Sequence, residues 1–99
     1  MKGFVISAHA RKDIVEITVY TKRIWGLPQA DRYLSQLEEG FDLLAQNSSI
    51  GRPCMTTDPE LFRFEVGKHV VFFRVRRAGV RIVRILHQQM IPLKTHFES

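Results

Sequence analysis

The sequence predicts an α+β fold: an N-terminal strand, an antiparallel helical hairpin and then a three-stranded antiparallel meander, with the helices packed on one face of the sheet. Apolar residues recur at spacings of three and four in the first half of the chain, as in amphipathic helices. After residue 60 the pattern changes to β-branched and aromatic runs typical of strands. With 99 residues, we expect a single domain over 1–99.

The first expected elements are a strand and a helix. The apolar run GFVIS ends at Ser7, whose hydroxyl can cap the first turn of a helix. Gly26 can adopt the left-handed conformation that ends this helix near Trp25. The helix should bury one stripe: Ala10, Ile14, Ile17, Thr21 and Ile24.

A second helix follows almost immediately. Pro28 suits its first turn, where no backbone N–H is needed. Its apolar stripe has the same spacing: Ala30, Leu34, Leu37, Phe41 and Leu44. Two helices joined by the short WGLP segment form an antiparallel hairpin. Residues 46–60 contain Gly, two Pro and several small polar residues, which indicates a connecting loop.

Three strands are expected in the second half, over 61–66, 69–77 and 80–87. Gly67 and residues 78–79 separate them and predict tight hairpin turns. The HVVFF run is apolar on both faces, which is typical of a central strand. The tail from Gln88 mixes polar and apolar residues, and its pattern assigns no structure.

Charge and cysteine content limit the classes of function. The net charge is +5, and the whole excess lies in residues 51–99, which suggests an acidic partner, either nucleic acid or an acidic protein segment. The single cysteine, Cys54, excludes an internal disulfide and a thiolate metal cluster. Because the histidines lack close ligand spacing, we expect no metal and no cofactor. No apolar run suits a membrane helix or a secretory signal, so we expect a cytoplasmic protein with no membrane partner.

The motifs ISAHARKDIVEITVYTKRIWGLPQADRYL, SSIGRP and RILHQQM, in this order, resemble the ParE branch of the ParE/RelE toxin superfamily. The resemblance runs from about Phe4 to Met90. It implies a small basic bacterial toxin, neutralised by a co-expressed antitoxin whose C-terminal segment wraps around it. ParE members act on DNA gyrase, whereas RelE-like relatives of the same fold cut mRNA on the ribosome. The fold alone therefore does not decide between these functions.

The resemblance leaves three hypotheses. The first is a toxin without enzymatic activity that binds and inhibits DNA gyrase. The second is a ribosome-dependent endoribonuclease that uses His87. The third is a member with little toxicity whose complex tunes its own operon. Sequence-specific DNA binding by this chain alone is not expected.

The register of the last hairpin decides what surrounds His87. A two-residue turn at 78–79, which matches the loop length of the family, places Val70 opposite His87. A three-residue loop would instead pair Arg76 with Val80 and turn the last strand over. We adopt the first register. It gives His87 an apolar neighbour and no second proton-transfer group, which favours a partner contact over a nuclease role.

In this register one sheet face points away from the helices and combines apolar residues with arginines, which suits an acidic amphipathic antitoxin segment. It carries Val70, Phe72, Arg74, Arg76, Arg81, Val83, Ile85 and His87. The antitoxin is also expected in the groove beside the hairpin. Two further residues are candidate contacts. Arg52 could contact a partner or brace its loop, and Trp25 is expected to pack where the hairpin turns, with an exposed anchor for a partner as the alternative.

Arg84 should point toward the helices in this register. The first helix carries two carboxylates three residues apart, Asp13 and Glu16, which share roughly one side. We therefore predict a structural ion pair of Arg84 with one of them.

Overall fold

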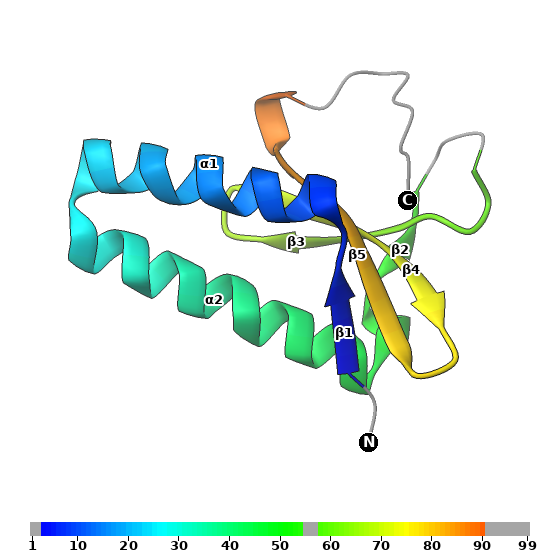
Figure 1. Ribbon diagram of the computed structural model, residues 1–99. Helices are drawn as coiled ribbons and strands as arrows, with labels where there is room; N and C mark the ends of the chain where they lie inside the picture. Colours follow the sequence, from blue (N-terminus) through cyan, green and yellow to red (C-terminus); the bar gives the residue numbers. More distant parts are fainter. Residues whose placement is uncertain (1–2, 55–57, 91–99) are drawn as a thin grey trace.

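The computed structural model describes residues 3–54 and 58–90. Helices α1 (Ala8–Trp25) and α2 (Leu27–Gln46) form a hairpin over one face of a sheet (Figure 1). The strands are β1 (Gly3–Ile6), β2 (Arg52–Pro53), β3 (Phe62–Val66), β4 (His69–Arg76) and β5 (Gly79–His87). Their order is β1-β5-β4-β3-β2, with β1 parallel to β5 and the other pairs antiparallel. The predicted α+β fold is confirmed.

The segment predicted as a loop is more ordered than expected. It contains a short 3-10 helix, Ser48–Ile50, and then β2, which pairs with β3 and extends the sheet to five strands. A second 3-10 helix, Gln88–Met90, begins the tail. Two-residue strands lie below the length at which an alternating pattern can be recognised, so sequence reasoning missed β2.

The helical hairpin forms where the local signals placed it. The Ser7 hydroxyl accepts a hydrogen bond from the amide of Ala10 at 3.1 Å and caps α1. Gly26 has φ +90° between the helices, in the region that favours glycine. Pro28 lies in the first turn of α2. Both helix ends are thus fixed by the chemistry of a few neighbouring residues.

The main core lies between the hairpin and the sheet. From α2, Leu37, Phe41 and Leu44 are buried against the helix-facing side chains of β4 and β5, among them Phe73 and Ile82. Burial of large apolar side chains is the principal stabilising contribution here, about 1.5–3 kcal/mol for each. The stripe predicted for α2 is therefore the face that packs on the sheet.

The opposite sheet face is covered too, which corrects the prediction of an open binding face. Leu61 packs over Val70, Phe72 and Val83 in a second, smaller core, and all four are at most 1% exposed. Arg74 is also buried and pairs with Asp58 of the same covering segment. These side chains are buried against one another and leave little exposed surface for a partner.

The β4–β5 hairpin follows neither expected register over its whole length. Its two turn residues are 77–78, so that Arg76 lies opposite Gly79. A bulge at Val83 then shifts the pairing by one residue. Beyond the bulge, His69 lies opposite His87, which is the pairing that the three-residue loop would have produced.

This bulge turns the end of β5 over. Side chains alternate along a strand, so one extra residue moves all later side chains to the other face. Ile85 therefore joins the core beneath the helices, and His87 lies on the helix-facing side opposite His69. The prediction that Ile85 and His87 lie on the face away from the helices was wrong for this reason.

Gly79 is required where β5 begins. It has φ +136°, and a Cβ there would lie 1.7 Å from the carbonyl oxygen of Gly3 on β1. The close approach lets β1 pair with β5 from the first residue of each strand. A side chain at position 79 would push the two strands apart.

The tip of the helical hairpin extends beyond the sheet (Figure 1). The 18 residues of α1 span about 27 Å, and only the first half packs closely on β5. Trp25 is consequently 68% exposed, which corrects the expectation that it packs at the turn. Neither helix in the described ranges is long and apolar enough to cross a membrane.

Candidate functional site

The start of α1 is attached to the edge of β5 by two side chains. β1 stops opposite Ile82, and beyond it the backbone of β5 needs other partners. The Ser7 hydroxyl donates to the Val83 carbonyl at 2.8 Å. Asp13 accepts the Ile85 amide at 2.9 Å. Ser7 and Asp13 therefore take over hydrogen bonding to the backbone of β5 beyond the end of β1.

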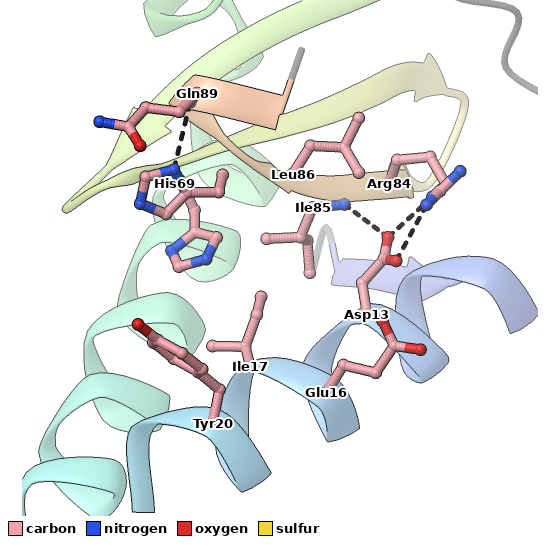
Figure 2. Close-up of a pocket in the computed structure, with 10 residues that line it drawn as sticks. Asp13, Glu16, Ile17, Tyr20, His69, Arg84, Ile85, Leu86 and Gln89 are labelled. Carbon is pink, nitrogen blue, oxygen red and sulfur yellow. Dashed lines mark hydrogen bonds and ion pairs between the residues drawn. The ribbon is translucent and has the colours of Figure 1, made fainter. Parts of the chain in front are cut away.

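Asp13 also holds Arg84. The carboxylate accepts from Nε and Nη2 of Arg84 at 2.8 and 3.1 Å (Figure 2). This bidentate pair raises the pKa of the Arg84 guanidinium above its usual value. Of the two carboxylates considered from the sequence, Asp13 is the partner, and Glu16 lines the same pocket without an ion pair to Arg84 among the described contacts. Asp13 rather than Glu16 pairs with Arg84 because the buried Asp13 carboxylate also accepts the hydrogen bond from the backbone of β5.

A groove runs from this attachment along the hairpin toward its tip, and we call it the hairpin groove. One part, of about 450 Å³, lies over Asp13, Arg84 and the end of β5 (Figure 2), and a second part, of about 600 Å³, opens between the helices and the β3–β4 turn. The two parts share Ile17, Tyr20, His69 and His87. The second part is lined further by Thr21, Ile24, Trp25, Gln29, Tyr33, Gln36, Gly67 and Lys68.

The outer half of the hairpin groove is apolar and open to solvent. Tyr20, Ile24 and Trp25 are each more than half exposed. Tyr20 and Ile24 lie at i and i+4 on one side of α1, and Trp25, at the end of the helix, lines the same part of the groove. Contiguous exposed apolar side chains beside a concave surface are typical of a protein interaction site.

Two histidines and a tyrosine form the floor of the groove. The rings of His69 and His87 meet edge to face, with centroids 5.3 Å apart. The Tyr33 hydroxyl is hydrogen-bonded to Nδ1 of His69 and accepts from the Lys68 amide at 3.3 Å. Nδ1 of His87 accepts from the Gln89 amide at 3.1 Å. Each imidazole thus uses Nδ1 to bind a neighbouring group.

Burial sets the protonation of this cluster. Desolvation lowers the pKa of His69 to about 4, and the nearby His87 adds to the effect. Desolvation also raises the pKa of the Tyr33 hydroxyl. At neutral pH both groups are therefore uncharged, and His69 is a weak base.

Phosphate chemistry at this cluster would need cations beside the histidines. Arg84 is bound to Asp13. Among the described residues that line the groove, this leaves Lys68 as the other arginine or lysine. The arrangement therefore suits binding better than phosphodiester cleavage. The adopted register predicted no second imidazole beside His87, but the structure places His69 there. Its low pKa and its hydrogen bond to Tyr33 nevertheless make His69 a poor proton acceptor.

The other residues proposed from the sequence do not gather at this groove. Arg52 lies on the edge strand β2 and forms an exposed ion pair with Glu65 at 2.5 Å. Arg76 and Arg81 lie at the far end of the β4–β5 hairpin. Of the proposed partner contacts, three line the groove: Trp25, Ile85 and His87.

Sequence reasoning missed several groove residues, of which Tyr33, His69 and Tyr20 are the most important. Tyr33 could have been found from helical spacing, since it lies three and four residues from Ala30 and Leu37 on the buried stripe. His69 could not, because its place beside His87 depends on the bulge.

Comparison with known proteins places most of the chain in one family. A family model described as the ParE toxin of the type II toxin-antitoxin system, parDE, matches residues 4–92. A Mycobacterium tuberculosis protein named toxin ParE1 is 36% identical over 88% of this chain and 90% of its own length. A Caulobacter vibrioides toxin ParE1 is 36% identical over 91% of this chain and 93% of its own. An Escherichia coli toxin ParE is 34% identical over 91% and 88%, respectively.

The fold is similar to a solved structure described as the chromosomal ParDE TA system from P. aeruginosa. The TM-score is 0.74 at 19% sequence identity, and the match covers 88% of this chain and 96% of the other. At this identity the likeness concerns the fold alone.

Proposed function

Because this chain belongs to the ParE toxin family of type II toxin-antitoxin systems, we propose that it inhibits DNA gyrase by binding and that a co-expressed antitoxin neutralises it in the cytoplasm. The observation that carries the binding role is the hairpin groove with its exposed apolar rim. A groove of this kind takes an amphipathic segment of another protein. The proposal treats the chain as an inhibitor rather than an enzyme.

The antitoxin segment is proposed to lie along the hairpin groove. Tyr20, Ile24 and Trp25 supply the apolar contacts, and aromatic side chains at the centre of an interface commonly contribute most of its binding energy. The floor of the groove is polar but uncharged at His69 and Tyr33, so it can be covered without leaving a charge unpaired. The proposed antitoxin site is therefore on the helix side of the sheet and not on the buried opposite face.

The gyrase proposal is tested by titrating the purified protein into a gyrase reaction on relaxed plasmid. We expect supercoiling to stop and linear DNA to appear after the protein is removed. His87→Ala should only weaken the effect, because His87 contributes surface and not proton transfer. No effect on gyrase, together with mRNA cleavage on ribosomes that His87→Ala abolishes, would replace this proposal with the endoribonuclease.

The antitoxin site is tested with Trp25, which is the single tryptophan of the chain and largely exposed. Its fluorescence should shift to shorter wavelength when the protein encoded beside this gene, free of tryptophan, is added. Trp25→Ala should weaken binding by at least about tenfold, as for a central aromatic contact. The matched control is Leu43→Ala, because Leu43 is 53% exposed on α2 and does not line the groove. Equal losses for both variants with no shift in emission would contradict this site.

A further inference from the structure

The second candidate surface is the end of the β4–β5 hairpin. Residues 74–84 include five arginines and no acidic residue. Two of these arginines are already neutralised: Arg74 by Asp58 at 2.6 Å and Arg84 by Asp13 at 2.8 Å. The other three are Arg76, Arg77 and Arg81, which we call the basic tip.

The basic tip has no carboxylate partner among the described residues. Arg76 and Arg77 are exposed, Arg81 is partly exposed, and none of them forms an ion pair in the part of the chain that the structure describes. The turn that carries them projects from the end of the sheet, away from the tip of the helical hairpin (Figure 1). The basic tip and the hairpin groove are therefore separate surfaces.

The ladder shows how these arginines are arranged. Arg81 lies opposite Arg74, and Arg76 lies opposite Gly79, two residues farther toward the turn. The two free guanidinium groups on this face therefore start about 7 Å apart along the strand direction. Like charges directly opposite each other destabilise a sheet, and here Asp58 relieves the pair from one side only. A polyanion bound to Arg81 would relieve it from the other.

The side chains around the basic tip favour nucleic acid over an acidic protein. Val75 is 47% exposed, but alternation along β4 points it to the opposite face from Arg76. The arginine face has no large exposed apolar side chain among the described residues of this hairpin, whereas protein interfaces depend on such anchors. Phosphates need only exposed, charged donors, and arginine is well suited to bind them.

We propose that the basic tip binds the phosphodiester backbone of duplex DNA without sequence specificity. The proposal rests on the proposed function, because it assigns the tip to the DNA that gyrase holds while the protein is bound to the enzyme. Each arginine would contact one phosphate and release counterions. The antitoxin's groove would remain at the other end of the molecule.

The test uses the purified protein and a fluorescently labelled duplex of arbitrary sequence, with binding followed by anisotropy between about 50 and 200 mM salt. Three contacts predict a slope of log affinity against log salt of about −2.7, and each is worth up to about eightfold in affinity at 0.1 M salt. The variant R76Q/R77Q/R81Q should lose the slope and at least about tenfold in affinity. R76K/R77K/R81K should retain most binding, since lysine also binds phosphate as a point charge.

The matched control is the triple variant Lys22→Gln, Arg23→Gln and Arg32→Gln. It removes the same charge from exposed positions near the tip of the helical hairpin formed by α1 and α2. It should leave DNA binding nearly unchanged. Equal losses in the two variants would overturn the proposal in favour of diffuse attraction by net charge. Tighter binding of a glutamate-rich peptide than of the duplex would overturn it in favour of an acidic protein partner.

The gyrase reaction separates this proposal from the function on which it rests. If wild type inhibits gyrase and R76Q/R77Q/R81Q inhibits it less, both stand. If the variant inhibits as strongly as wild type, the basic tip proposal fails while gyrase inhibition remains. If wild type itself has no effect on gyrase, the proposed function fails, and the anisotropy series still decides whether the tip binds DNA.

Discussion

Removing the Asp13 carboxylate should be among the most damaging single changes in this chain. Asp13→Ala leaves the Ile85 amide without its acceptor and the Arg84 guanidinium without its counterion. Breaking a buried charged pair from one side costs about 3–5 kcal/mol, but Arg84 keeps 29% of its side chain exposed and can be partly rehydrated. We therefore expect a loss of about 3–4 kcal/mol, equivalent to about 15–25 °C in Tm for a domain of this size.

The partner variants separate the three hydrogen bonds. Arg84→Met should cost about 2 kcal/mol, because Asp13 keeps the Ile85 amide but loses its counterion. The double variant should cost about as much as Asp13→Ala alone, since Arg84 has nothing left to lose once Asp13 is gone. A charge exchange, Asp13→Arg with Arg84→Glu, should not restore stability, because it places a cation against the Ile85 amide.

Unfolding in urea followed by circular dichroism measures these differences, because the exposed Trp25 is a poor reporter of the core. Additive losses in the double variant would refute the ion pair as an energetic unit. If Asp13→Ala lowers the free energy of unfolding by less than about 1 kcal/mol, the role assigned to Asp13 in attaching α1 to the edge of β5 is refuted.

Three further predictions concern the same framework. The His69 contribution to the free energy of unfolding should be constant above about pH 6.5 and fall by about 1–2 kcal/mol between pH 6.5 and 4. In this range the unfolded chain binds a proton at His69, whereas the half-buried native imidazole, with its pKa lowered to about 4, does not. Urea titrations of His69→Gln should lose this pH dependence. Gly79→Ala should destabilise by at least about 3 kcal/mol through its clash with β1, whereas Gly3→Ala, whose Cβ meets nothing within 4 Å, should be nearly neutral in the same assay. Ser7→Ala should lower stability by about 1–3 kcal/mol through loss of the cap and of the Val83 carbonyl's donor, and Ser7→Thr should recover most of it; equal melting temperatures for Ser7→Ala and wild type would contradict this.

The parts of the fold that the sequence predicted well depend on neighbours in the chain. Helix capping and the first-turn proline act within one helical turn, so the identities of Ser7, Gly26 and Pro28 are enough to predict their roles. The Arg84 ion pair was also found, because burying an arginine on the helix side requires a carboxylate and α1 offers few. The resemblance to the ParE family was also correct, and the family model confirms it.

The parts that failed depend on contacts between residues far apart in the sequence. The bulge at Val83 arises where β1 ends and Ser7 takes over the β5 carbonyl, 76 residues apart in sequence. No local pattern marks it, and it decides the face of Ile85 and His87. The covering of the opposite sheet face by Leu61 and Asp58 was likewise hidden, because a loop's polar composition does not reveal where it folds back.

The attachment of α1 to β5 also constrains the order in which the protein can be built. During synthesis the β1 strand, the Ser7 cap and the Asp13 carboxylate leave the ribosome first, but their partners lie at residues 79–85. The first helix can coil early, yet it cannot be anchored until nearly the last strand has emerged. A growing chain therefore lacks the finished hairpin groove until late in translation. A folded toxin with this groove therefore exists only once nearly the whole of β5 has been made.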